Sequence, residues 1–222
     1  MTTNPTHHVP DERLAEYAAG ACGEAPALGI ACHVSLCAAC AARLRAFEAV
    51  GGAVLETGAP DATAPGALEA VLARLDDVPA ELPAVDPAAE RLLAPLGVPR
   101  VVWRYLAPGA AAAGWRRLVP GIAGLDLRVG AAGTMARLVR LRPGLEIPLH
   151  DHGGDEHTVI LTGALADDEG RFARGDISIR AAGARHVQRV EHDEPCVALV
   201  VNEGALVPLT LKGKLLGLFW QG

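Results

Sequence analysis

The chain has 222 residues, 50% of them hydrophobic and 21% charged, a composition that supports packed globular domains and excludes a disordered chain. No apolar run is long enough to span a membrane, and the first residues lack the basic and apolar segments of a signal peptide, so a cytoplasmic protein is expected. The net charge of −6 is concentrated in the first 100 residues, which argues against direct binding of nucleic acid.

The first part of the chain is expected to be helical. A helix opens at Asp11, and Gly20 is its expected stop. Three more segments carry apolar residues at helical spacing: residues 26–34, a segment from Leu44 to Val50 that ends at two glycines, and residues 67–75 after Gly66. This pattern predicts a small all-α domain over residues 1–78.

The composition changes after this helical part. Five prolines lie between residues 79 and 99, and their spacing predicts a linker at 79–100 with one short helix at 88–93. Short apolar or alternating segments then indicate strands at 101–103, 115–119, 125–129, 135–141, 158–161, 176–179 and 197–201. We therefore expect an α+β multidomain chain whose second part, residues 101–205, is an all-β sandwich or barrel, with a C-terminal extension at 206–222.

His33, Cys37 and Cys40 form a first candidate metal site. Two cysteines three residues apart can bind one ion, and a histidine four residues before the first lies on the same helical face. A closed structural zinc site needs a fourth ligand, which His7 or His8 can supply. A redox-active cysteine pair is the alternative, but such a pair normally follows a strand in an α/β unit, which this segment lacks.

A second candidate metal site begins at His150, His152 and Glu156. Histidines two residues apart on a strand point to the same face, so the interior of a barrel would receive both imidazoles. Glu156 can add a carboxylate, and His186, which follows another predicted strand, can add a third imidazole. Three imidazoles and one carboxylate suit zinc, iron, manganese or nickel, and the pattern does not choose among these metals.

The second site resembles the metal site of the cupin family. Residues 144–163 match the first cupin motif at every defined position: a glycine, five residues, His-x-His, three residues, Glu, six residues and a glycine. Residues 175–186 resemble the second motif, although Ala181 replaces its usual proline and Val190 its usual asparagine. The resemblance implies that the all-β part is a cupin (jelly-roll) barrel.

The first site resembles that of the zinc-binding anti-sigma domain, whose signature is a distant histidine followed by His-x3-Cys-x2-Cys. Carried over one by one, the ligands are His8, His33, Cys37 and Cys40, with His7 as the alternative for the first position. An anti-sigma domain, a linker and a single cupin make up the ChrR-type anti-sigma factors, and the resemblance covers nearly the whole chain.

This resemblance implies a regulator rather than an enzyme. Its helical domain would hold a sigma factor of the extracytoplasmic-function group inactive, and its cupin would sense singlet oxygen or organic hydroperoxides. The stripe of Leu68, Val71, Leu72 and Leu75 would then contact the partner, and packing inside the domain is the alternative. The pattern leaves the oligomeric state open.

Three other functions deserve comparison. A metal-dependent cupin enzyme could bind O₂ at an open metal position, but it would not need the first metal site. A zinc finger that touches DNA conflicts with the acidic first half. A thiol switch at Cys37 and Cys40 would share the sigma partner and differ in the sensor. His157 and His192 are expected at the surface, whereas Cys22, Cys32 and Cys196 are expected to pack as small apolar residues.

Overall fold

The computed structural model describes residues 4–75, 86–130, 133–204 and 206–209. Helices come first, and eleven strands follow in the described residues. The helical elements are α1 (Asp11–Ala18), α2 (Glu24–Val34), α3 (Ala38–Thr57), α4 (Ala67–Ala73), α5 (Pro87–Leu93), the 3₁₀ turn η1 (Ala94–Leu96), α6 (Arg100–Trp103) and α7 (Ala110–Ala113).

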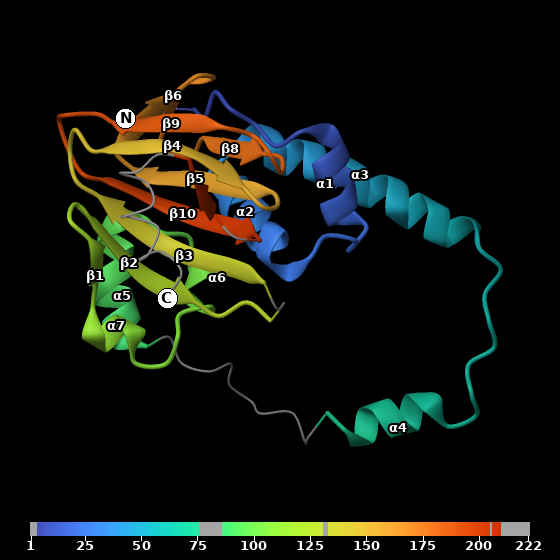
Figure 1. The fold of residues 1–222 in the computed structure, drawn as a ribbon. Helices are drawn as coiled ribbons and strands as arrows, with labels where there is room; N and C mark the ends of the chain where they lie inside the picture. Colours follow the sequence, from blue (N-terminus) through green and yellow to red (C-terminus); the bar gives the residue numbers. More distant parts are fainter. Residues whose placement is uncertain (1–3, 76–85, 131–132, 205, 210–222) are drawn as a thin grey trace.

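The strands form two antiparallel sheets that face each other as a sandwich (Figure 1). One sheet has six strands in the order β1-β2-β3-β10-β5-β8, and the other has five in the order β11-β4-β9-β6-β7. This architecture confirms the expected α+β class with a cupin-type β-sandwich. The strands are β1 (Arg116–Val119), β2 (Ile122–Leu127), β3 (Thr134–Leu141), β4 (Glu146–His152), β5 (Glu156–Thr162), β6 (Ala164–Asp167), β7 (Gly170–Ala173), β8 (Ile177–Arg180), β9 (His186–Val190), β10 (Cys196–Glu203) and β11 (Leu206–Pro208).

Two hydrophobic cores meet at the six-stranded sheet. Alternate side chains of its strands, such as Val139 and Val200, face the inside of the sandwich. Their neighbours Leu138 and Leu199 face the helices and pack with Leu28 of α2 and Val102 of α6. Strands that are buried on both faces carry apolar runs, as β10 does over residues 196–201 and β5 does over residues 159–161. The helical part is therefore built onto the sheet and shares a core with it.

The short helix expected at 88–93 is present as α5, but the residues around it pack into the fold and do not form an extended linker. Residues 86–100 form α5, η1 and the start of α6, and Leu93 and Val98 are buried in the core shared with the helices. Asp86 caps α5 by accepting a hydrogen bond from the Ala88 amide at 2.8 Å, and Pro87 occupies the first helical turn, where its missing N–H costs nothing. The rest of the predicted linker, 79–85, lies outside the described residues.

Two further expectations need correction. Residues 101–103 belong to a helix rather than a strand, because they follow Pro99 and turn Val102 into the core. Helix α3 continues through Gly51 and Gly52 to Thr57. These glycines adopt helical backbone conformations, at a cost of roughly 1 kcal/mol each relative to alanine.

The expected set does not include β6, β7, β9 and β11, which are short or rich in polar residues, whereas β4 is the strand expected to carry His150 and His152. The expected C-terminal extension begins inside the fold, because Leu206–Pro208 pairs with β4, whereas residues 210–222 lie outside the described part. Among the described residues, no helix combines the length and apolar character needed to cross a membrane.

Candidate metal centres

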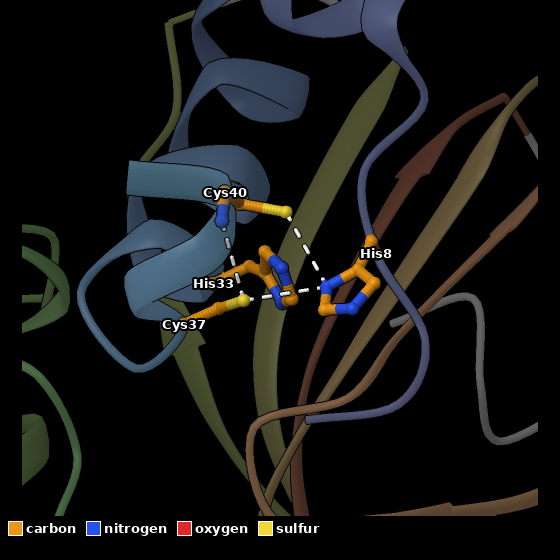
Figure 2. Close-up of side chains that lie close together, drawn as sticks. All are labelled: His8, His33, Cys37 and Cys40. Atoms are coloured by element: carbon orange, nitrogen blue, oxygen red, sulfur yellow. Dashed lines mark hydrogen bonds between the residues drawn. The ribbon is translucent and has the colours of Figure 1, made fainter. Parts of the chain in front are cut away.

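The first group of ligands is assembled by three neighbouring segments of the helical part. His8 lies just before α1, His33 is in the last turn of α2, and Cys37 and Cys40 lie at the start of α3. Figure 2 shows the four side chains pointing toward one another. Cys37 is the N-cap of α3, and its sulfur accepts a hydrogen bond from the Cys40 amide at 3.4 Å. The tight α2–α3 turn therefore places both sulfurs beside the histidine of the preceding helix.

The ligand atoms of this group lie close enough to share one ion. One ligand atom from each of the four residues lies within 4.8 Å of the other three. His8 Nδ1 is 3.3 Å from Cys37 Sγ and 3.6 Å from Cys40 Sγ. The Nε2 atom of His33 is buried and has no hydrogen-bond partner in the part of the chain that the structure describes. Two sulfurs and two nitrogens in this arrangement fit a tetrahedral zinc site.

The electrostatics of this group favour neutral imidazole and make a bare thiolate costly. Burial lowers the pKa of His33 to about 4, so its ring is neutral at physiological pH. Burial also raises the pKa of the Cys40 thiol. A bound cation would reverse this effect, because a thiolate that ligates a metal is stabilised by the charge of the ion.

The structure distinguishes the two candidate histidines that precede α1. His8 faces the cysteines, whereas the ring of His7 packs on Phe172 of β7 with the ring centroids 4.1 Å apart. His7 Nδ1 also lies 3.6 Å from the carboxylate of Asp176. His7 is therefore turned toward the cupin part and away from the ligand group.

The second group lies inside the sandwich. His150 and His152 come from β4, Glu156 from the start of β5, and His186 from the start of β9. All four are buried, and the shared face of β4 gives both of its histidines the same direction. The structure thus brings together all four residues that the two cupin motifs single out.

The imidazoles of the second group converge through their Nε2 atoms. His186 Nε2 lies 2.9 Å from His150 Nε2 and 3.1 Å from His152 Nε2. Glu156 places a carboxylate oxygen 3.5 Å from His152 Nδ1 and another 3.9 Å from His186 Nε2. Three nitrogen lone pairs at this separation repel one another unless a cation or a proton lies among them, so the group fits a divalent metal.

Other residues orient these rings. His150 Nδ1 donates to the Pro148 carbonyl at 2.9 Å, and His186 Nδ1 lies 3.2 Å from Asp167. Burial favours the neutral form of Asp167, but hydrogen bonds from His186 and Arg180 outweigh burial and lower its pKa to about 2. An ionised carboxylate on the far side of a ligating imidazole fixes the ring and strengthens it as a ligand. The spacing of the cupin motifs gives no signal for Asp167.

Metal binding to the second group is expected to tighten as the pH rises toward neutrality. Burial raises the pKa of Glu156 to about 7, whereas it lowers the pKa of His150 and His152 to about 4. Below about pH 7, metal must displace the Glu156 proton, so the logarithm of the association constant should rise by about one per pH unit and level off above that pH. Zinc titrations of metal-free wild type and Glu156→Gln at several pH values measure this. If Glu156→Gln showed the same dependence of the association constant on pH as wild type, the Glu156 proton would not be its cause.

An apolar cavity opens beside this group. Its wall is formed mainly by aliphatic residues of both sheets, and His150, Glu156 and Gln188 supply polar atoms at its lining. The Nε2 atom of Gln188 is buried and finds no hydrogen-bond partner among the described residues. A small molecule or a chain of water can therefore approach the ligand group from inside the sandwich.

The cysteines and histidines outside the two ligand groups lie mostly where the sequence predicts, with one exception. Cys32 and Cys196 are buried as expected, and burial raises the pKa of each thiol to about 12, which keeps them from reacting as thiolates. Cys22 is only partly buried. His192 is exposed as expected, but His157 is buried between β5 and α2, because α2 covers this face of the sheet.

Fold and sites together define a two-part protein in which a helical region with a Cys₂His₂ group is packed onto a cupin with a His₃Glu group. Residues 107–207 match the family model of the ChrR cupin-like domain. The anti-sigma-E factor ChrR of Cereibacter sphaeroides is 37% identical over 206 residues, which is 90% of this chain and 91% of that protein. The crystal structure of Rhodobacter sphaeroides SigE in complex with the anti-sigma ChrR matches with a TM-score of 0.69 and 34% identity, covering 90% of this chain and 100% of that chain.

The chain belongs to the ChrR family of anti-sigma factors. The resemblance drawn from the two sets of ligands is thereby confirmed, and it extends through both parts of the chain. Membership makes this protein a transcriptional regulator, so the alternative of a cupin enzyme is set aside.

Proposed function

We propose that this chain binds a sigma factor of the extracytoplasmic-function group through its helical region and releases it when the cupin responds to an oxidative signal, singlet oxygen or an organic hydroperoxide. The similarity to a protein solved in complex with SigE supports the class of partner. The proposed site of action is the bacterial cytoplasm, and neither DNA nor a membrane is a proposed partner.

The observation that carries this proposal is the exposed apolar surface of α4. Its stripe has the one-face spacing of an amphipathic helix, and no residue of α4 is buried. The exposed fractions are 65% for Leu68, 59% for Val71, 52% for Leu72 and 57% for Leu75. In Figure 1, α4 lies apart from the sandwich at the end of an extended segment.

Such a surface fits a partner better than solvent. Monomeric proteins seldom expose contiguous apolar stripes, and an apolar helix face is a common element of recognition in a groove. The alternative from the sequence, that these side chains pack inside the helical domain, does not agree with their exposure. The far end of α3 adds Val54 and Leu55, which are also exposed. The proposed contact surface is therefore α4 together with the end of α3.

We propose zinc as the ion of the first group, held by His8, His33, Cys37 and Cys40. Two thiols and two imidazoles prefer zinc to the harder divalent cations. α1 buries Leu14, and α3 buries Cys40 and Leu44, so an ion adds stability that this small set of contacts lacks. For the second group, His150, His152, Glu156 and His186, we propose zinc or another divalent metal such as iron, manganese or nickel.

The proposed division of the chain follows from these roles. Residues 1–78 form the sigma-binding domain, and the cupin extends from 101 to 205. Residues 86–100 pack in the core between the two parts, so we group them with the body of the protein instead of a free linker. The proposed sigma-binding surface of α4 then lies apart from the sandwich (Figure 1).

The partner is tested by co-purification of the full-length chain with the sigma factor encoded beside it, followed by competition with core RNA polymerase. A stable complex that keeps the sigma factor from the core enzyme supports the proposal. Failure of the full-length chain to form any complex would overturn it.

A His150→Ala variant is expected to keep inhibition and to lose the response to the signal, because the altered residue lies in the cupin group and far from α4. Sigma-dependent transcription with and without a photosensitiser measures both properties. The matched control is His192→Ala, which changes an exposed cupin histidine outside the group. Loss of inhibition in His150→Ala would show that the inhibitory and sensing roles are not divided as proposed.

A further inference from the structure

A turn of the cupin contacts the residues that hold the ligand group of the helical region. The turn between β7 and β8, residues 174–176, lies against the segment that carries His8 and against the side chain of His33. Gly175 has a left-handed backbone with φ +89°, and a Cβ there would lie 2.8 Å from the ring of Pro5. A glycine is therefore required for the N-terminal segment to approach this turn so closely.

The turn directly sets which ring nitrogen of His33 carries the proton. The His33 Nδ1 atom lies 2.7 Å from the carbonyl oxygen of Gly175. A carbonyl oxygen can only accept, so Nδ1 must carry the proton and donate it. The other ring nitrogen, Nε2, then has a free lone pair directed at the group, and this is the buried nitrogen without a protein partner. Such an outer contact normally sets the tautomer and orientation of a ligating histidine.

The turn holds a second ligand through the backbone. The Asp176 carboxylate is buried and accepts from the amides of Thr6 at 2.6 Å and His7 at 2.9 Å. Its other oxygen accepts from the Ala173 amide at 2.8 Å, which ties the carboxylate to β7. His8 follows these two residues directly, so the position of its ring depends on Asp176.

We propose that Gly175 and Asp176 are positioning residues for the helical zinc group, and that this cupin turn sets how firmly the group retains its metal. Two of the four ligands, His8 and His33, depend on the turn, whereas Cys37 and Cys40 are held within α3. The inference rests on the proposed zinc site and adds to it a dependence on the cupin.

The test uses the full-length chain loaded with Co²⁺ in place of zinc. Absorption from a cobalt–thiolate bond reports on the first group alone, because the cupin group contains no cysteine. The rate at which this band disappears in excess chelator measures metal release. Asp176→Ala is expected to speed release about tenfold or more, because losing a group that orients metal ligands typically lowers metal affinity by about 10–100-fold. Asp176→Asn should fall between this variant and wild type, since its amide oxygen can still accept from residues 6 and 7.

The matched control is Asp155→Ala. Asp155 also joins the cupin to the helical part, through an ion pair with Arg13, but it does not touch a ligand of the first group. We expect its release rate to stay within about twofold of wild type.

Two results would overturn the inference: unchanged release in Asp176→Ala, or equal acceleration in Asp155→Ala, which would indicate general loosening of the two parts. If Asp176→Ala does not fold, Asp176→Asn decides, and a wild-type rate then counts against the inference. Absence of a thiolate band in the wild-type chain would overturn the zinc assignment itself.

Discussion

A Cys37→Ser variant is expected to lose one equivalent of zinc and the ability to bind the sigma factor. Structural zinc contributes about 10–16 kcal/mol of apparent binding free energy in zinc-finger peptides, which is comparable to the whole stability of a domain. Without the ion, the buried Nε2 of His33 and the buried thiols have lost their common partner. We therefore expect α1 and the start of α3 to unfold locally, while α2 stays packed on the sandwich.

Metal analysis, far-UV circular dichroism and the co-purification described above measure these losses. The matched control is Cys32→Ala, which removes a buried thiol from α2 one residue before His33 but outside the ligand group. Cys32→Ala should lower the free energy of unfolding by about 1 kcal/mol. The variant should still bind the metal and the sigma factor. Wild-type zinc content in Cys37→Ser would show that the group does not hold the ion.

The second large effect is expected from charge on α4. A Leu68→Asp, Leu72→Asp double variant should weaken sigma binding at least 100-fold, because central apolar contacts of an interface each contribute about 2 kcal/mol or more and the new carboxylates would be desolvated. The free chain should melt at its wild-type temperature, since both leucines are more than half exposed.

Isothermal titration of the purified chains gives the affinity, and a thermal melt gives the stability. Glu69→Gln is the matched control on the same helix, at an exposed position between the two leucines. An affinity within about threefold of wild type in the double variant would exclude α4 from the interface. A lowered melting temperature would mean that the stripe packs within the free molecule after all.

Both ligand groups could be assembled from the sequence because their members lie close together along the chain. His33, Cys37 and Cys40 span two turns of backbone, and His150, His152 and Glu156 lie on one strand and the start of the next. Only His8 and His186 come from a distance. The neighbouring sequence cannot decide between His7 and His8 as the first ligand. The residues that bind His7, Phe172 and Asp176, lie more than 160 residues away in the chain.

The fold is harder to predict where prolines suggest an exposed segment or where burial depends on distant packing. The short helix at 88–93 is predictable from the sequence, and Asp86 and Pro87 supply its start, but the density of prolines hides the burial of Leu93 in the core. His157 reads as a surface residue because it has no companion ligand, but α2 covers its face of β5. That contact depends on how two distant segments pack, which no local pattern encodes.

The hydrogen bonds between residues 6–7 and Asp176 join positions about 170 apart in the chain. During synthesis, all four ligands of the helical group leave the ribosome before the β7–β8 turn has been made. At about 5–20 residues per second, the newborn helices wait on the order of ten seconds for their cupin support. A growing chain thus passes through a stage in which its metal is held by the helices alone. The contacts that give full retention of the ion are among the last to form.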